Sequence, residues 1–174
     1  MADSLPQAAL HAFEAERDSI HRRAKQQGRE LTASEGIRLE ELYSEHVEGY
    51  LDSGAGACYL ARPEIAELVA GALLHFNGKR YRLEAWCVMP NHVHVVFTVS
   101  RGESLKKILH SWKSYTAHKA CEILGLSGEF WQREYYDHLV RNEQELARLV
   151  RYTESNPAKA HLSDWRWCSA AAPR

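Results

Sequence analysis

Two segments of alternating character, residues 81–88 and 92–99, constrain the fold of this chain most strongly. In residues 81–88 apolar and polar side chains alternate, which is typical of a β-strand with one buried face. Residues 92–99 are rich in β-branched side chains, which favours a second strand. The short Met89-Pro90-Asn91 connection between them allows a tight turn. We therefore expect an antiparallel hairpin.

The second of these strands carries His92 and His94 on either side of Val93. Alternate residues of a strand share a face, so both imidazoles are expected to project together, away from Val93. Neutral imidazole is a common metal ligand. Two on one strand would form half of a divalent-metal site suited to phosphate chemistry. The same pattern is also compatible with two packed histidines that bind nothing.

Helical patterns surround this hairpin. We expect helices over residues 6–27, from Thr32 or Ser34 to about residue 47, over 63–76, over 104–124, and from Asn142 to a stop at Asn156-Pro157. A short strand is expected at 57–60. This order predicts an α+β fold in which helices pack on an antiparallel sheet. The first two helices form a predicted N-terminal helical extension, residues 1–54, before a main domain of residues 55–174.

Charge is distributed unevenly along the chain. Residues 1–70 contain 7 Lys and Arg against 13 Asp and Glu, whereas residues 71–174 contain 15 against 10. The basic half also holds seven of the ten histidines and the predicted hairpin. This asymmetry favours a polyanionic partner, with ordinary surface charge as the alternative.

Other sequence features bear on location. No apolar run approaches the roughly 18–20 residues that span a bilayer, so no membrane association is expected. The first residues lack the basic and then apolar order of a signal peptide. The four cysteines are widely spaced and form no CxxC pair, which indicates reduced thiols and a cytoplasmic protein.

The predicted helix over residues 104–124 offers a candidate nucleophile. On a helical wheel Tyr115 falls at the edge of the apolar stripe, where its hydroxyl can remain free. A phenol can attack phosphorus when a nearby cation stabilises the developing charge. Glu122 lies two turns further along on the same side and is a possible third metal ligand. The alternative is that Tyr115 simply belongs to an amphipathic surface.

Residues 89–97 resemble the signature of the small single-tyrosine HUH transposases (His, hydrophobic, His), specifically the REP-associated tyrosine transposases. Further segments that are similar, in the same order, are Ser111-Trp112-Lys113-Ser114-Tyr115-Thr116, Phe130-Trp131-Gln132, Tyr136-Asp137-His138-Leu139-Val140-Arg141, Arg151-Tyr152 and Glu154-Ser155-Asn156-Pro157-Ala158-Lys159-Ala160. The resemblance covers residues 57 to 168, and its specificity lies in the ordered set.

This resemblance implies a ferredoxin-like α+β fold with the HUH strand central in the sheet. It implies metal-dependent cleavage and rejoining of single-stranded DNA through a 5′-phosphotyrosine, often at hairpin or palindromic repeat elements. His92 and His94 would then be ligands of Mg or Mn, and Tyr115 the nucleophile. The expected partner is single-stranded or hairpin DNA, bound by a monomer or homodimer.

The chain departs from that family at the position of the third ligand. The family tends to have Asn or Gln shortly after the tyrosine, whereas His118, Lys119 and Cys121 follow Tyr115 here. Glu122 is the remaining candidate at this place. The departure leaves one alternative open, a domesticated and catalytically weak protein that binds hairpin DNA.

Overall fold

The structure is a computed structural model that describes residues 7–43, 51, 54, 56–133 and 135–169. Apart from its first two residues, the chain divides into two compact units. These are Asp3–Ala57 and Cys58–Arg174. The predicted domain boundary between residues 54 and 55 stays a prediction, because this division does not test whether either unit folds alone. Within the described residues, no helix is long and apolar enough to cross a membrane.

The first unit contains two helices, α1 (Gln7–Gln26) and α2 (Ala33–Tyr43), as the sequence predicts. They contact each other, and Arg38 of α2 donates to Glu16 of α1 at 3.0 Å. A reciprocal capping box begins α2: Thr32 N donates to Glu35, and Glu35 N donates to the Thr32 hydroxyl. The predicted extension of α2 to residue 47 lies outside the described residues.

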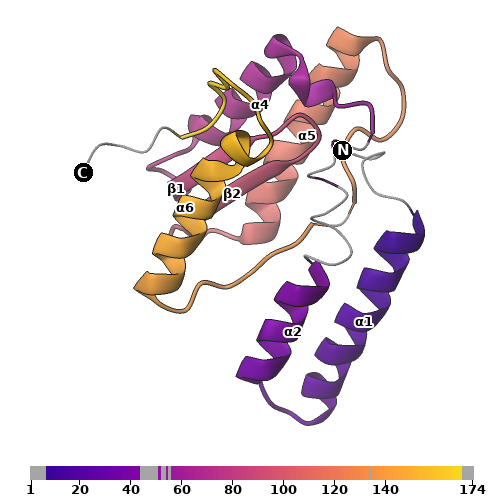
Figure 1. Cartoon of the computed structure of the whole chain (residues 1–174), viewed down its shortest axis with the longest axis vertical. Helices are drawn as coiled ribbons and strands as arrows, with labels where there is room; N and C mark the ends of the chain where they lie inside the picture. Colours follow the sequence, from indigo (N-terminus) through magenta and orange to yellow (C-terminus); the bar gives the residue numbers. More distant parts are fainter. Residues whose placement is uncertain (1–6, 44–50, 52–53, 55, 134, 170–174) are drawn as a thin grey trace. The chain divides into compact units, whose positions relative to one another are not determined.

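The second unit is α+β, as predicted (Figure 1). Its elements are the 3-10 helix η2 (Tyr59–Ala61), α4 (Pro63–His75), β1 (Tyr81–Val88), β2 (Val93–Val99), α5 (Leu105–Leu124) and α6 (Glu143–Lys159). The strand expected at 57–60 is wrong. Cys58 has a left-handed φ of 49°, and Leu60 N donates to Pro90 O, so this segment turns into η2 instead. Among the described residues the sheet consists of β1 and β2 alone, so β2 has a neighbouring strand on one side only. The expected central position of the strand with His94 is therefore wrong for this part of the chain.

The hairpin is antiparallel, but a β-bulge between Leu83 and Ala85 changes the face of the residues that follow. Before the bulge, Leu83 is paired with Phe97; after it, Trp86 is paired with Val95 and Cys87 with His94. Paired residues share a face, so Trp86 lies on the same face as Leu83. The uninterrupted alternation expected from the sequence is therefore wrong beyond this point.

The hydrophobic core lies between the hairpin and the helices α4 and α5. Trp112 of α5 packs against Tyr81 and Phe97, with ring centroids 4.9 and 5.1 Å apart. This contact identifies the face of β2 that α5 covers. Because His94 lies three residues from Phe97, it points to the opposite face, where α6 contacts both strands.

Helix α6 continues past the predicted stop at Asn156-Pro157 and ends at Lys159. Its start is as predicted, since the Asn142 side chain accepts from Glu145 N at 2.8 Å. Pro157 removes one N–H donor, but the helix resumes at once with Ala160 N donating to Asn156 O at 3.0 Å. The last turn therefore keeps Lys159 on the helix.

Tyr81→Phe is expected to reduce the free energy of unfolding by about 1–3 kcal/mol, because it removes a buried bridge. The Tyr81 hydroxyl donates to Leu73 O at 2.7 Å and accepts from Trp112 Nε1 at 3.0 Å. Urea unfolding measures the change. The matched control is Tyr135→Phe at an exposed position, expected to stay within about 0.5 kcal/mol of the unmodified chain. Equal effects of the two substitutions would contradict the bridge.

Candidate metal and tyrosine site

The two histidines face each other across a very short gap. His92 Nε2 and His94 Nε2 are 2.8 Å apart, and His92 Nδ1 lies 2.7 Å from Asn91 Oδ1. The amide oxygen can only accept, so this network assigns the Nδ1 proton to His92 and directs its Nε2 lone pair toward His94. The two rings then share one proton between their Nε2 atoms. A divalent cation would replace that proton.

Both imidazoles are held in the neutral form. Burial lowers the pKa of His92 well below its usual value, and the neighbouring His94 lowers it further. Burial also lowers the pKa of His94 to about 4, with a further contribution from the charge of Lys159. A ligand nitrogen must be unprotonated, so these neutral rings could bind a metal at neutral pH once the proton between the two Nε2 atoms is displaced.

The spacing of the two nitrogens fits a small octahedral cation. Ligands about 2.0–2.1 Å from such an ion place adjacent donor atoms about 2.9 Å apart. The observed separation between His92 Nε2 and His94 Nε2 is 2.8 Å. No cluster of three or more His, Cys, Asp and Glu that could hold a metal occurs in the part of the chain that the structure describes. A cation held by this pair would take its remaining ligands from other groups, such as an amide oxygen, water or phosphate.

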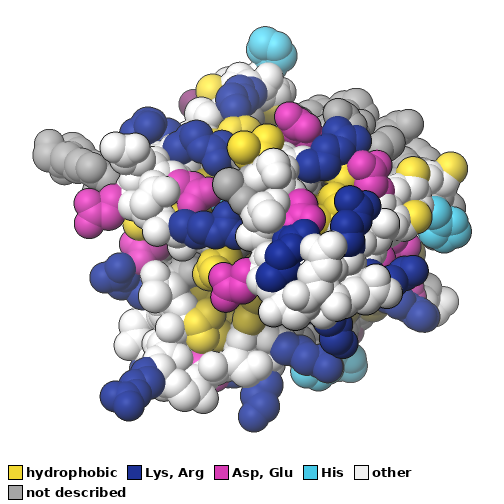
Figure 2. Space-filling model, turned by 90° about the horizontal axis from the view of Figure 1, so that it is seen from below, with side chains coloured by type: hydrophobic (Ala, Val, Ile, Leu, Met, Phe, Trp, Pro, Cys, Tyr) yellow, Lys and Arg dark blue, Asp and Glu magenta, His cyan; other side chains and the backbone are white. Residues whose placement is uncertain are grey.

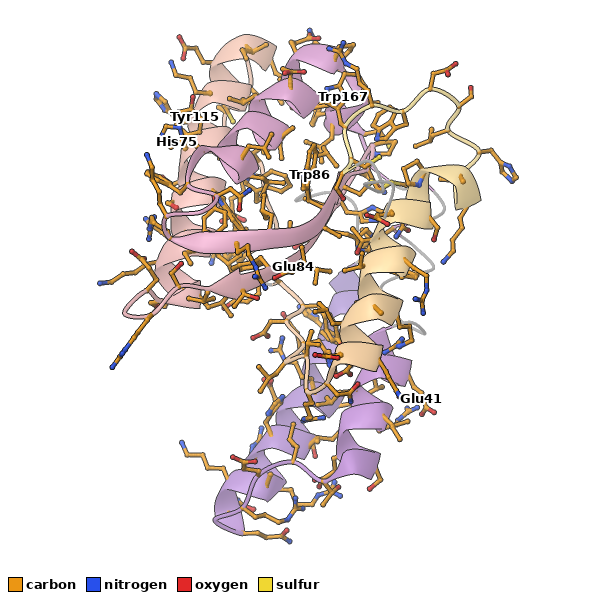
Figure 3. The ribbon with its side chains drawn as sticks, turned by 90° about the vertical axis from the view of Figure 1, so that its left-hand side faces the viewer. Glu41, His75, Glu84, Trp86, Tyr115 and Trp167 are labelled. Atoms are coloured by element: carbon orange, nitrogen blue, oxygen red, sulfur yellow. The ribbon has the colours of Figure 1, made fainter. Side chains whose placement is uncertain are left out.

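Tyr115 is not brought to these histidines. It lies on α5, 54% exposed, and lines a cavity of about 530 Å³ together with His75 of α4 and Ser111. Figure 3 shows Tyr115 and His75 together, with the hairpin between them and α6. The helical wheel placed Tyr115 at the edge of the stripe correctly, but a wheel does not say which face of the sheet the helix covers.

Glu122, the predicted third ligand, is also absent from the histidine face. It belongs to α5, is exposed, and pairs with Lys119 at 2.9 Å. The Lys119 ammonium, through a hydrogen bond and its charge, lowers the pKa of this carboxyl. Glu122 is thus one half of a surface ion pair on the helix that covers the other side of the hairpin.

Tyr152 of α6 occupies the place predicted for Tyr115. Its ring centroid lies 5.6 Å from that of His94, with the rings nearly perpendicular. Asn156 follows one turn later, is 2% exposed, and donates from Nδ2 to Tyr152 O at 2.9 Å. The sequence contained a signal for this pair. Asn156 follows Tyr152 by four residues, whereas the residue four positions after Tyr115 is Lys119, which has no amide.

Acid is expected to destabilise the metal-free protein through His94. Its pKa is about 4 in the folded chain against about 6.5 unfolded, so the unfolded state binds the proton more readily. The stabilising contribution is complete above pH 6.5 and is lost as the pH falls toward 4. Urea unfolding at pH 7 and pH 5 should show a larger loss for the unmodified chain than for His94→Asn, which cannot titrate. Equal losses would contradict a neutral His94.

Charged side chains of both signs are mixed on one face of the molecule. Figure 2 shows Lys and Arg interspersed with Asp and Glu on the face in view, without one extended patch of either sign. Ion pairs also occur among the described residues, such as that of Arg133 with Glu129.

The fold and the paired histidines define a class of protein. Residues 64–156 match the IS200-like transposase family, which is more than half of the chain. The chain belongs to this family. The matched region includes both histidines and both tyrosines, Tyr115 and Tyr152.

Two curated relatives give the comparison more detail. The REP-associated tyrosine transposase of Escherichia coli (strain K12) is 28% identical over 94 residues, covering 51% of this chain and 54% of the relative. A Haemophilus influenzae protein whose description also names a REP-associated tyrosine transposase is 24% identical over 99 residues. The match covers 49% of this chain and 56% of that relative. The chain thus spans about half the length of the curated relatives it matches. No solved structure matches it significantly.

Proposed function

We propose that this chain cleaves and rejoins single-stranded DNA through a covalent 5′-phosphotyrosine at Tyr152, in a reaction that requires Mg or Mn. One observation carries this proposal: the Tyr152 ring lies against His94, on the face of the hairpin where the two Nε2 atoms converge. The names of the curated relatives, which describe REP-associated tyrosine transposases, support a DNA substrate.

The proposed metal ligands are His92, His94 and the side-chain oxygen of Asn156. Asn156 is buried, and its Nδ2 is engaged with Tyr152 O, which leaves Oδ1 available as an acceptor. The family expectation of an amide shortly after the tyrosine supports this choice. When bound, the cation would polarise a phosphate oxygen of the DNA and offset its charge.

The protein residues have separate roles in the proposed reaction. Asn91 fixes the tautomer of His92, and burial keeps His94 neutral. Tyr152 Oη attacks the phosphorus, so that the Oη–P bond forms and the P–O3′ bond breaks. The phenol proton passes to solvent, and the departing 3′ oxygen takes a proton from solvent. Attack by a 3′-hydroxyl on the phosphotyrosine reverses these steps and rejoins the strand.

The test is covalent capture of DNA by the full chain. End-labelled single-stranded oligonucleotides with a hairpin and randomised flanks are incubated with Mg or Mn, and in parallel with EDTA, before a denaturing gel. We expect a labelled protein adduct with metal and none with EDTA. Salt-dependent binding of the same DNA without any adduct would overturn the proposal in favour of a protein that only binds hairpins.

A further inference from the structure

Lys159, at the end of α6, contacts the ring of Tyr152, which in turn lies against His94. Its Nζ lies 4.1 Å from the centroid of the Tyr152 ring. Its charge also reaches His94, where it contributes to the lowered pKa. The side chain is exposed, so its ammonium beside the Tyr152 ring is accessible to a substrate that arrives from solvent.

The contact depends on the extra turn of α6 after Pro157. Residues seven apart lie on the same face of a helix, so a helix that reaches Lys159 holds this side chain two turns beyond Tyr152. If the helix ended at Asn156-Pro157, Lys159 would lie outside it and would not be aligned with Tyr152 on one helix face. The ring face contacts one side of the ammonium, and the N–H donors directed away from the ring can bind phosphate oxygens.

Attack on a phosphodiester requires, above all, that the developing negative charge be stabilised. Charge develops on the phosphate oxygens and on the leaving oxygen, and a fixed cation beside the nucleophile stabilises it. The histidines are neutral and cannot supply that charge themselves. An ammonium binds phosphate as a compact point charge.

We propose that Lys159 binds the scissile phosphate beside Tyr152 and stabilises its charge during attack. This inference rests on the proposed function. The ammonium takes part in no bond change: the Oη–P bond forms, the P–O3′ bond breaks, and the protons exchange with solvent as above. Lys159 acts by charge and placement, which distinguishes this role from simple packing against the Tyr152 ring.

The first experiment is single-turnover adduct formation by the full chain. Lys159→Met keeps an apolar stem over the ring without the charge, and is expected to slow adduct formation by about 10²-fold, as loss of one preorganised donor does. Lys159→Arg should recover much of that rate. The matched control is Lys107→Ala, an exposed lysine on α5, expected to change the rate by less than about threefold. A normal rate for Lys159→Met would overturn the inference.

The second experiment does not depend on catalysis. In the Tyr152→Phe background, the scissile phosphate is replaced by a neutral methylphosphonate at the position mapped with the unmodified chain. We expect this to weaken DNA binding by about fivefold when Lys159 is present and to have no effect with Lys159→Met. Equal weakening in both proteins would contradict a contact between Lys159 and that phosphate.

Different results would overturn the proposed function and the proposed role of Lys159. An adduct that persists in Tyr152→Phe overturns the proposed function and the role of Lys159 together. An adduct that is lost in Tyr152→Phe but unaffected in Lys159→Met overturns only the role of Lys159. Absence of any adduct on the unmodified chain with Mg and with Mn overturns both.

Discussion

Tyr152→Phe is expected to reduce the covalent DNA adduct to background, while Tyr115→Phe leaves its rate within about twofold of the unmodified chain. The reason is the packing of the two helices. Tyr152 lies on α6 against His94, whereas Tyr115 lies on α5 beside a cavity shared with α4. Only Tyr152 lies on the face of the hairpin where a cation held by the histidines could assist attack on phosphorus.

These two substitutions are matched controls for each other. Each removes a single hydroxyl from a helical tyrosine, so a general effect on stability should be similar and small, and thermal unfolding checks this directly. Denaturing gels with labelled hairpin DNA give the adduct rates. Loss of the adduct in Tyr115→Phe, with retention in Tyr152→Phe, would contradict the structural assignment and restore the assignment made from sequence.

His94→Ala is expected to slow metal-dependent cleavage by at least about 10³-fold, which corresponds to several kcal/mol of lost charge stabilisation. It removes one of the two nitrogens that are 2.8 Å apart and breaks the contact with the Tyr152 ring. Binding of Mn, followed by calorimetry, should weaken in parallel. Binding of hairpin DNA should change by less than about threefold, because phosphate contacts over the whole strand dominate that affinity.

His75→Ala is the matched control for this second substitution. His75 is exposed, lies on α4, and lines the cavity next to Tyr115. We expect Mn affinity and adduct rate close to those of the unmodified chain. If His94→Ala retains both quantities, or if His75→Ala loses them, the paired histidines are not the metal site.

The local patterns of the sequence were sufficient for much of the second unit. The hairpin, the N-cap at Asn142 and the shared face of His92 and His94 all depend on neighbours in the chain, and the structure contains them. The bulge between Leu83 and Ala85 was not predicted, because the residues around it fit an uninterrupted strand equally well. Its effect is to place Cys87, not Trp86, opposite His94.

The choice between two tyrosines could not be made from periodicity. A wheel gives the angle of Tyr115 around its helix, but the face of the sheet that a helix covers is set by contacts far apart in sequence, such as Trp112 with Phe97. The same limit applies to Glu122. The segment with Tyr152 and Asn156 is among those that resemble the family. Its proposed role depends on the contact between Tyr152 of α6 and His94, which only the structure contains.

The most direct test of this account is to locate the DNA on the protein. The adduct is digested with nuclease and protease, and mass spectrometry identifies the residue that carries the remaining nucleotide. The account predicts modification of Tyr152, in the peptide that also contains Asn156. Modification of Tyr115, or of any residue outside α6, would contradict it.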